Sequence, residues 1–240
     1  MRKLLADQAA ILGDKPYMIF IDRDEKALSF AALHRRGNQI AHFFAERGLK
    51  RNDRVFMLSE KSLEFIAVFL VVQRCGATIA TSNVEMNRAY IGEILHAVDH
   101  ALVLVQEGLG LEDLRDPEMA VDWLALGDWN ETGGSTGFFD VLSNYPDDDD
   151  IAEVCTPEDI AVIFYTSGTE AKPKGVMQAH SAVWPNYDAT ADCVDLDERG
   201  RVVDCTGIFP KKVRGIRNRK ELCFASCRAA LAFLFHQPGQ

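Results

Sequence analysis

The sequence lacks an apolar run long enough to cross a lipid bilayer. Its longest run, Phe65 to Val72, has 8 residues, whereas a spanning helix needs roughly 20. The amino terminus starts with basic residues, but Asp7 soon interrupts the apolar stretch that follows, so we expect no signal peptide. The pattern therefore predicts a protein without a transmembrane segment.

Paired cysteine spacings are also lacking in the first half of the chain. The six cysteines stand at positions 75, 155, 193, 205, 223 and 227. This usage is typical of a reduced, cytoplasmic protein. Cys205, Cys223, Cys227 and His236 do not match the usual spacings of zinc ligands, so the sequence predicts no metal site.

Positive charge is scarce in most of the chain. The formal net charge of −10 hides an asymmetry: residues 1–198 carry 17 Lys and Arg against 34 Asp and Glu, whereas residues 199–240 carry 9 against 2. The acidic body argues against nucleic-acid binding. The basic segment is either an arm for nucleic acids or membrane surfaces or sequence unrelated to the body. We favour the second, because the segment has few aromatic residues for base stacking.

The sequence does have an alternation of strand and helix patterns. Short apolar runs predict strands at 17–21, 54–59, 77–81, 101–106 and 160–165. Longer segments with helical spacing predict helices at 30–48, 62–76 and 87–100. Ser29 is a suitable N-cap for the first helix, and Gly48 and Gly76 are suitable terminators. This order predicts an α/β fold, with a parallel sheet and helical crossovers formed by residues 17–106 and 160–165 as a further strand.

Residues 107–150 break the alternation. The segment is rich in acids and contains TGGSTG, so we expect an exposed connection with one short helix near 112–126. The acid run at 147–150 is expected to be a solvated linker rather than a metal site. Residues 156–159 (TPED) carry a cap, an early proline and first-turn acids, which predict a single helical turn before the strand at 160–165.

After that strand comes the segment TSGTEAKPKG, which holds several hydroxyls, two glycines and two lysines. Glycines allow a turn in which backbone N–H groups converge on an anion, while the hydroxyls add donors and Lys172 and Lys174 add charge. This composition suits a polyphosphate ligand. It is not a Walker loop, which needs G-x4-G-K-[ST] directly before a helix. By composition alone, a polar surface turn is the alternative.

The run YTSGTEAKPKGVMQAH, from Tyr165 to His180, resembles the phosphate-binding signature of the AMP-forming acyl-CoA synthetases, the adenylate-forming ligase superfamily. Residues 28–83 resemble the opening βαβ segments of the same family, and the likeness covers roughly residues 10–195. It implies the first subdomain of the family's N-terminal domain. It also implies a reaction in which a small carboxylic acid attacks the α-phosphate of ATP, with Mg2+ present, before a thiol, commonly coenzyme A, takes the acyl group.

Carried over residue by residue, the resemblance implies that the phosphates contact Thr166, Ser167, Gly168, Thr169, Glu170, Lys174 and Gly175. Their role is to hold the leaving pyrophosphate and offset its developing charge. Glu170 and Ala171 replace the family's usual Thr and Gly, and Glu170 resembles a subset of fatty acyl-CoA synthetases. Ala179 replaces the Thr before His180, which we expect to be a structural residue at a helix start rather than a general base.

After about residue 198 the resemblance ends. The family's Y-G-x-T-E and T-G-D segments and its C-terminal lysine have no counterpart, so no catalytic residue is assigned. The sequence predicts a partial AMP-binding domain at 1–198 and a basic tail at 199–240, unrelated or out of frame. We expect carboxylate activation as the family function, with this chain inactive alone. The alternative is a non-catalytic fragment or pseudoenzyme that at most binds nucleotide or phosphate weakly.

Overall fold

The computed structural model describes residues 2–21, 26–60, 62–106, 108–111, 114–115, 121–126, 141–148, 151–152, 154–165, 174–183, 201–204 and 221–225. The chain divides into two compact units. The first contains residues 36–60 and 64–180, and the second contains residues 2–35, 61–63 and 181–240. One helix, α2 (Phe30–Glu46), begins in the second unit and ends in the first.

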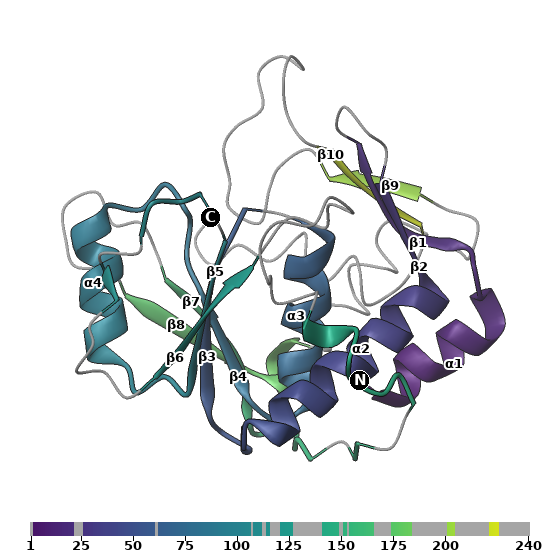
Figure 1. Cartoon of the computed structure of the whole chain (residues 1–240), viewed down its shortest axis with the longest axis horizontal. Coiled ribbons are helices and arrows are strands. Elements are labelled where there is room, and N and C mark those ends of the chain that lie inside the picture. The colour runs from purple at the N-terminus through teal and green to yellow at the C-terminus, as the bar shows by residue number, and fades with distance from the viewer. Residues whose placement is uncertain are drawn as a thin grey trace. The chain divides into compact units, whose positions relative to one another are not determined.

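The described part of the first unit contains a six-stranded sheet (Figure 1). Its strands are β3 (Arg54–Leu58), β4 (Thr78–Thr81), β5 (Leu102–Gln106), β6 (Asp122–Leu126), β7 (Ile160–Tyr165) and β8 (Gly175–Ala179). Along the sheet the order is β6-β5-β3-β4-β7-β8. Neighbouring strands from β6 to β7 are parallel, and β8 runs antiparallel to β7. The predicted α/β fold with a mainly parallel sheet is therefore confirmed.

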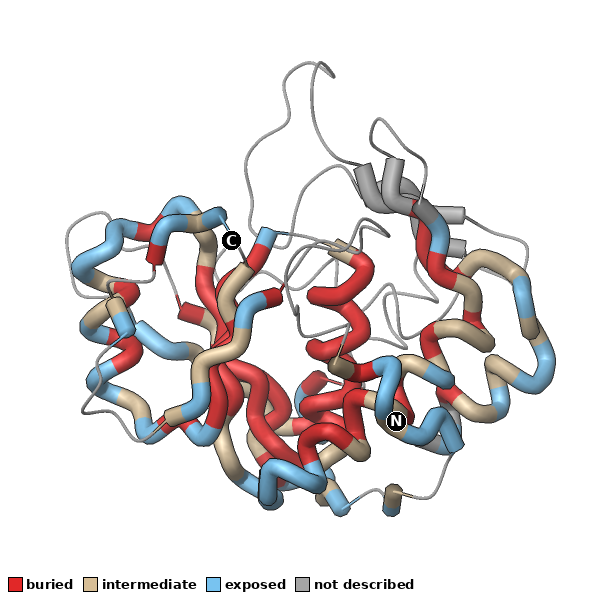
Figure 2. Tube along the Cα trace, viewed as in Figure 1, coloured by how far each residue is buried: buried red, intermediate tan, exposed pale blue. Residues whose placement is uncertain are grey.

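Two helices connect the central strands and lie on opposite sides of this sheet (Figure 1). α3 (Leu63–Arg74) joins β3 to β4, and α4 (Arg88–Ala97) joins β4 to β5. Every residue of α3 is buried (Figure 2), as expected of a helix that is apolar around nearly its whole circumference. The core on the α4 side combines helix and strand residues: Phe56, Leu58, Ala80, Ile91, Ile94, Leu95, Val103 and Ile163.

The helix ends follow local signals in the sequence. At the start of α2, Ser29 Oγ accepts a hydrogen bond from the Ala32 N–H at 3.1 Å, which confirms the predicted N-cap. Gly48 and Gly76, just beyond α2 and α3, have φ angles of 73° and 74°. This is the left-handed region in which glycine ends a helix with little strain, so both predicted terminators are confirmed.

The described part of the second unit contains a separate antiparallel sheet in the order β2-β1-β10-β9. Its elements are α1 (Arg2–Leu12), β1 (Pro16–Ile21), β2 (Lys26–Ser29), β9 (Arg201–Asp204) and β10 (Glu221–Ala225). The strand predicted at 17–21 is present, but its assignment to the parallel sheet is wrong, because β1 pairs antiparallel with β2 and β10. The domain boundary expected at 198/199 stays a prediction.

The structure also corrects the expectation for residues 107–150. Residues 122–126 (DWLAL) form β6, which pairs in parallel with β5, so the short helix predicted near 112–126 is wrong over these residues. A short apolar run fits either a helix or a strand, and pairing with β5 decides between them. Residues 156–159 form a hydrogen-bonded turn, in which the Asp159 N–H donates to the Thr156 carbonyl at 3.2 Å.

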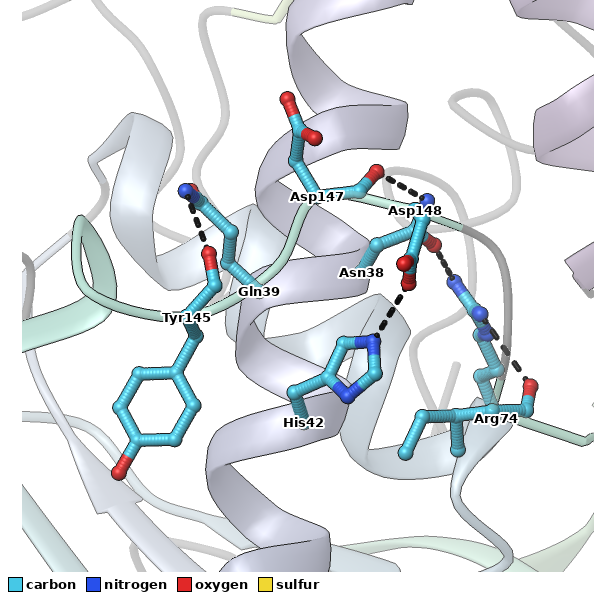
Figure 3. A network of polar contacts seen from close by, with 8 residues as sticks. Asn38, Gln39, His42, Arg74, Tyr145, Asp147 and Asp148 are labelled. Carbon is cyan, nitrogen blue, oxygen red and sulfur yellow. Dashed lines mark hydrogen bonds and ion pairs between the residues drawn. The ribbon is translucent and has the colours of Figure 1, made fainter.

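A polar network in the first unit holds the segment before β7 against two helices (Figure 3). Arg74, the last residue of α3, donates to Asn38 Oδ1 at 2.6 Å and to the Ile151 carbonyl at 3.4 Å. Asn38, in α2, donates in turn from Nδ2 to the Asp147 carbonyl at 2.9 Å. Arg74 and Asn38 are each 1% exposed, so the centre of this network is buried.

The edge of the same network includes part of the acid run at 147–150. His42 Nε2 lies 2.9 Å from Asp148 Oδ1, and the side chains of Asp147 and Asp148 are exposed. Asp149 and Asp150 lie outside the described residues. The described half of the run is therefore solvated, as expected, but it also contacts α2 through His42.

His100 is expected to make the stability of the fold depend on pH. The residue is 5% exposed, and its ring centroid lies 5.3 Å from that of Phe56. Burial is the main cause that lowers its pKa from 6.5 to about 4. Between these pH values the unfolded chain binds a proton at this histidine that the folded chain does not. The free energy of unfolding should therefore fall as pH is lowered through this window, by at most about 1.4 kcal/mol per pH unit.

Urea unfolding at a series of pH values measures this slope. The variant His100→Phe keeps an aromatic ring but cannot be protonated, so the difference between its profile and that of the wild type isolates the histidine. Parallel profiles for the two proteins between pH 6.5 and 4 would contradict the expectation.

Candidate functional site

The segment that resembles a phosphate-binding signature connects two antiparallel strands. β7 ends at Tyr165 and β8 begins at Gly175, and these two residues are paired in the sheet. No pattern in the sequence predicts β8. The helix start predicted at His180 is confirmed, because residues 180–183 are helical. The signature run from Tyr165 to His180 therefore includes all of β8, and its residues 166–174 connect the paired ends of β7 and β8.

Most of the candidate phosphate contacts fall on this connection. Thr166, Ser167, Gly168, Thr169 and Glu170 lie outside the described residues, so their roles stay predictions. Lys174 and Gly175 are described, and both are exposed. Tyr165 is the last residue of β7 before the connection, and Lys174 and Gly175 are the first described residues after it.

The hairpin carries the signature to the carboxyl edge of the parallel sheet. β7 pairs in parallel with β4, with Phe164 opposite Thr81, so both strands end at the same edge. Ligands of open α/β sheets bind outside this edge. The hydroxyls of Thr81 and Ser82 are buried there without a hydrogen-bond partner in the described part of the chain. This edge therefore has hydrogen-bonding capacity that the described residues do not use.

Along the same edge, polar residues at the ends of β3 and β5 are hydrogen-bonded to each other. The Ser59 hydroxyl donates to Gln106 Oε1 at 3.0 Å, and the Glu60 N–H donates to the same oxygen at 2.7 Å. Gln106 is the last residue of β5. Polar residues thus lie at or just after the ends of β5, β3 and β4, which are neighbours in the sheet. This is typical of a ligand-binding edge.

Gly175 has a packing reason to be glycine, which the sequence analysis did not foresee. A Cβ added at this position would lie 3.0 Å from Ile163 Cγ2 and 3.1 Å from Tyr165 Cε1. Tyr165 is 7% exposed, and burial raises the pKa of its hydroxyl. The Tyr165 ring therefore lies directly against the Gly175 backbone, and this contact closes the hairpin end beside the signature.

An ion pair that the sequence analysis missed fixes the start of β7. Arg51 donates from Nε and Nη2 to the two carboxylate oxygens of Asp159, each at 2.8 Å. This hydrogen bonding is the first cause that lowers the pKa of Asp159 to about 2, so the carboxylate is ionised at neutral pH. The Asp159 carbonyl accepts the His180 N–H at 3.0 Å. Arg51 and Asp159 are 108 residues apart, so no local pattern indicates the pair.

His180 fits the structural role expected for it. The residue is 3% exposed, begins the helical residues that follow β8, and donates its backbone N–H to Asp159. Its position ties the end of the hairpin to the start of β7.

A protein-family model described as "AMP-binding enzyme" matches residues 5–208 of this chain. The match covers most of the sequence and includes both the parallel sheet and the signature segment. It ends somewhat beyond position 198, where the resemblance was expected to stop.

Curated proteins with similar sequences are much longer than this chain. Tyrocidine synthase 1 from Brevibacillus parabrevis is 26% identical over 183 residues, which are 76% of this chain and 15% of that protein. Gramicidin S synthase 2 from Aneurinibacillus migulanus is 29% identical over 206 residues, which are 86% of this chain and 4% of that protein. The chain therefore spans a small part of the length of these relatives.

Solved structures of similar fold also extend beyond this chain. ATP-bound MatB from Rhodopseudomonas palustris has a TM-score of 0.67 at 22% identity and is matched over 83% of this chain and 39% of its own. A Mycobacterium tuberculosis fatty acyl CoA synthetase has a TM-score of 0.64 at 20% identity, over 82% of this chain and 38% of its own. At sequence identities of 22% and 20%, the structural likeness shows that this chain shares their fold.

Proposed function

Because the chain belongs to the AMP-binding enzyme family, we propose that it serves the ATP-dependent activation of a carboxylic acid. In this reaction the carboxylate attacks the α-phosphate of ATP, pyrophosphate leaves, and an acyl adenylate forms. A thiol, which we propose to be that of coenzyme A, then takes the acyl group. The observation that carries the proposal is the signature after β7, which lies within the matched region and starts at the carboxyl edge of a parallel sheet.

The residues available at this edge fit a triphosphate. Lys174 is exposed where the signature returns to the sheet and supplies positive charge, while Gly175 lets the strand pack against Tyr165. The full set that we propose for the phosphates is Thr166, Ser167, Gly168, Thr169, Glu170, Lys174 and Gly175. Hydroxyl, N–H and ammonium donors placed there would offset the charge that develops on the leaving pyrophosphate.

Magnesium bound with ATP would neutralise charge on the phosphates. Among the residues that the structure describes, no group of three or more His, Cys, Asp or Glu side chains is arranged to hold a metal ion. We propose that the phosphates of ATP hold the ion, since magnesium in nucleotide sites is bound largely through substrate oxygens.

One further feature bears on the substrate, and another bears on the location. A glutamate at the position of Glu170 in the signature resembles the pattern of a subset of fatty acyl-CoA synthetases. We therefore propose a fatty acid as the carboxylic substrate. In the described stretches, no helix has both the length and the apolar character to span a bilayer. Cys75 is a free thiol, which supports the proposal of a cytoplasmic protein.

Removing the charge of Lys174 is expected to weaken ATP binding about tenfold or more. A hydrogen bond to a charged group contributes about 1.5–3 kcal/mol net, and about 1.4 kcal/mol corresponds to a factor of ten in affinity. Isothermal titration calorimetry with ATP and magnesium, on the wild-type chain and on Lys174→Ala, measures the change.

Lys172→Ala is the matched control. It removes the same charge two residues earlier in the same segment, at the variable position of the family signature, so a smaller loss of ATP affinity than in Lys174→Ala is expected. Equal losses in the two variants would mean that the segment attracts ATP only through its general positive charge. No binding by the wild-type chain would contradict the proposal. Binding without exchange of labelled pyrophosphate into ATP is the result expected of this chain alone, and exchange above a no-protein control would contradict the expectation that it is inactive.

A further inference from the structure

The carboxyl end of β4 carries two adjacent hydroxyl groups that are buried without a hydrogen-bond partner. Thr81, the last residue of β4, and Ser82, which follows it, are 0% and 1% exposed. Among the side chains that the structure describes, no other hydroxyl is both buried and without a partner. Native proteins contain few such groups, because burying an unpaired polar group costs free energy. Two in succession therefore indicate a partner from outside the described residues.

The other end of the same strand provides a comparison. Thr78, the first residue of β4, is 4% exposed, and its hydroxyl donates to the Ile160 carbonyl of β7 at 2.7 Å. Thr78 and Thr81 are thus the same residue type on one strand, and both lie beside β7. Of the two, it is Thr81, at the carboxyl edge, that lacks a partner. This is the edge at which open α/β sheets bind their ligands.

The strand register places Ser82 beside the start of the signature. Thr81 lies opposite Phe164 in the parallel pair of β4 and β7, so Ser82 follows at the level of Tyr165, the last residue of β7. On the other side of β7 lies β8, and Lys174 directly precedes β8 and is exposed. Two strand spacings, about 9.5 Å, therefore separate the hydroxyl pair from the strand that Lys174 precedes. Three linked phosphates are long enough to contact both.

The backbone next to the hydroxyl pair is held in place. The Asn83 side chain accepts the Glu85 N–H at 2.9 Å, and the Asn83 carbonyl accepts the Met86 N–H at 3.0 Å. Asn83 is itself half-buried and Glu85 is exposed, so the pair lies directly below the surface of the edge. Because both hydroxyls are attached to a fixed backbone, they lose little conformational freedom when a ligand binds.

We propose that the hydroxyls of Thr81 and Ser82 donate hydrogen bonds to phosphate oxygens of ATP. The inference rests on the proposed function, in which the signature after β7 holds the triphosphate. Lys174 and the hydroxyl pair then contact the phosphates from opposite sides of β7. Phosphate oxygens are charged acceptors, which form stronger hydrogen bonds than neutral ones. Enclosure from water strengthens such bonds further.

Calorimetric titration with ATP and magnesium, together with urea unfolding, tests the inference. The double variant Thr81→Val and Ser82→Ala removes both hydroxyls and little else. Its affinity for ATP should fall about tenfold or more, since each lost bond was made to a charged group. Its midpoint of urea unfolding without ATP should equal or exceed that of the wild type, because an unpaired buried hydroxyl does not stabilise the unliganded chain.

Thr78→Val is the matched control, since it makes the same change at the other end of β4. It removes the hydrogen bond to Ile160, so its unfolding midpoint should fall, while its affinity for ATP should stay that of the wild type. The two sets of variants are therefore expected to separate binding from stability in opposite ways.

The outcomes distinguish this inference from the proposed function. If the wild-type chain binds ATP and the double variant binds it equally well, the inference is wrong and the proposed function stands. If the wild-type chain binds no ATP, the proposed function fails and the inference fails with it. A double variant that is less stable than the wild type, or does not fold, would show that the hydroxyls have a structural role and would also overturn the inference.

Discussion

Replacing Arg74 with alanine is expected to lower the free energy of unfolding by about 2–5 kcal/mol. Arg74 is 1% exposed, and its guanidinium donates to Asn38 Oδ1 and to the Ile151 carbonyl. Without it Asn38 Oδ1 loses a buried donor and the half-buried Ile151 carbonyl loses another; a buried unsatisfied group costs about 1–3 kcal/mol. The substitution also leaves a cavity at the end of α3, which adds to the loss.

The effect is measured by urea unfolding, followed by circular dichroism. Arg35→Ala removes the same side chain from an exposed position of α2 and should stay within about 0.5 kcal/mol of the wild type. Arg74→Lys keeps a positive charge but not the planar fork, so its stability should lie between those of the wild type and Arg74→Ala. A loss in Arg74→Ala no larger than that in Arg35→Ala would show that the buried network contributes little.

Gly175→Ala is expected to lower the free energy of unfolding by about 1–3 kcal/mol, which is typical of overpacking. The new methyl group would meet Ile163 Cγ2 and Tyr165 Cε1 at 3.0 and 3.1 Å, and Tyr165 is too well enclosed to move away freely. Displacing the Tyr165 ring would also shift the hairpin end from which the signature leaves. If the signature binds ATP as proposed, the affinity for ATP should fall together with the stability.

Gly92→Ala is the control for this prediction. Gly92 lies inside α4, and a Cβ there would have its nearest neighbour, Leu114 Cδ2, at 3.8 Å, an ordinary contact distance. Because alanine favours a helix over glycine by about 0.5–1 kcal/mol, this variant should be as stable as the wild type or more so. Thermal unfolding and ATP titration of both variants measure the two effects. Equal behaviour of the two alanine variants would contradict the packing role of Gly175.

The sequence by itself determined those features that depend on neighbouring residues. The Ser29 cap and the glycines after α2 and α3 act on backbone groups within one helical turn, so their positions could be identified without a fold. The apolar character of residues 63–72 indicated a buried helix, and the structure buries all of α3. The alternation of such elements was enough to predict an α/β fold, because few other arrangements cover both faces of a parallel sheet.

The composition of the signature is likewise a local property, and with the family resemblance it predicts a phosphate ligand, which stays a prediction. It did not show that Gly175 pairs with Tyr165 across a hairpin, or that a side chain at position 175 would meet Ile163. These contacts depend on the register of β7 and β8. Register is set by how two strands pair and not by the residues of either strand alone.

Only the tertiary structure decided which strands share a sheet. Residues 17–21 and 54–58 both have the apolar pattern of a strand, yet β1 pairs with β2 and β10 while β3 pairs with β4 and β5. Residues 122–126 form a strand that pairs in parallel with β5. The Arg51–Asp159 ion pair joins residues 108 positions apart. Such pairings gain their free energy from partners distant in the chain, and for that reason no local pattern contains them.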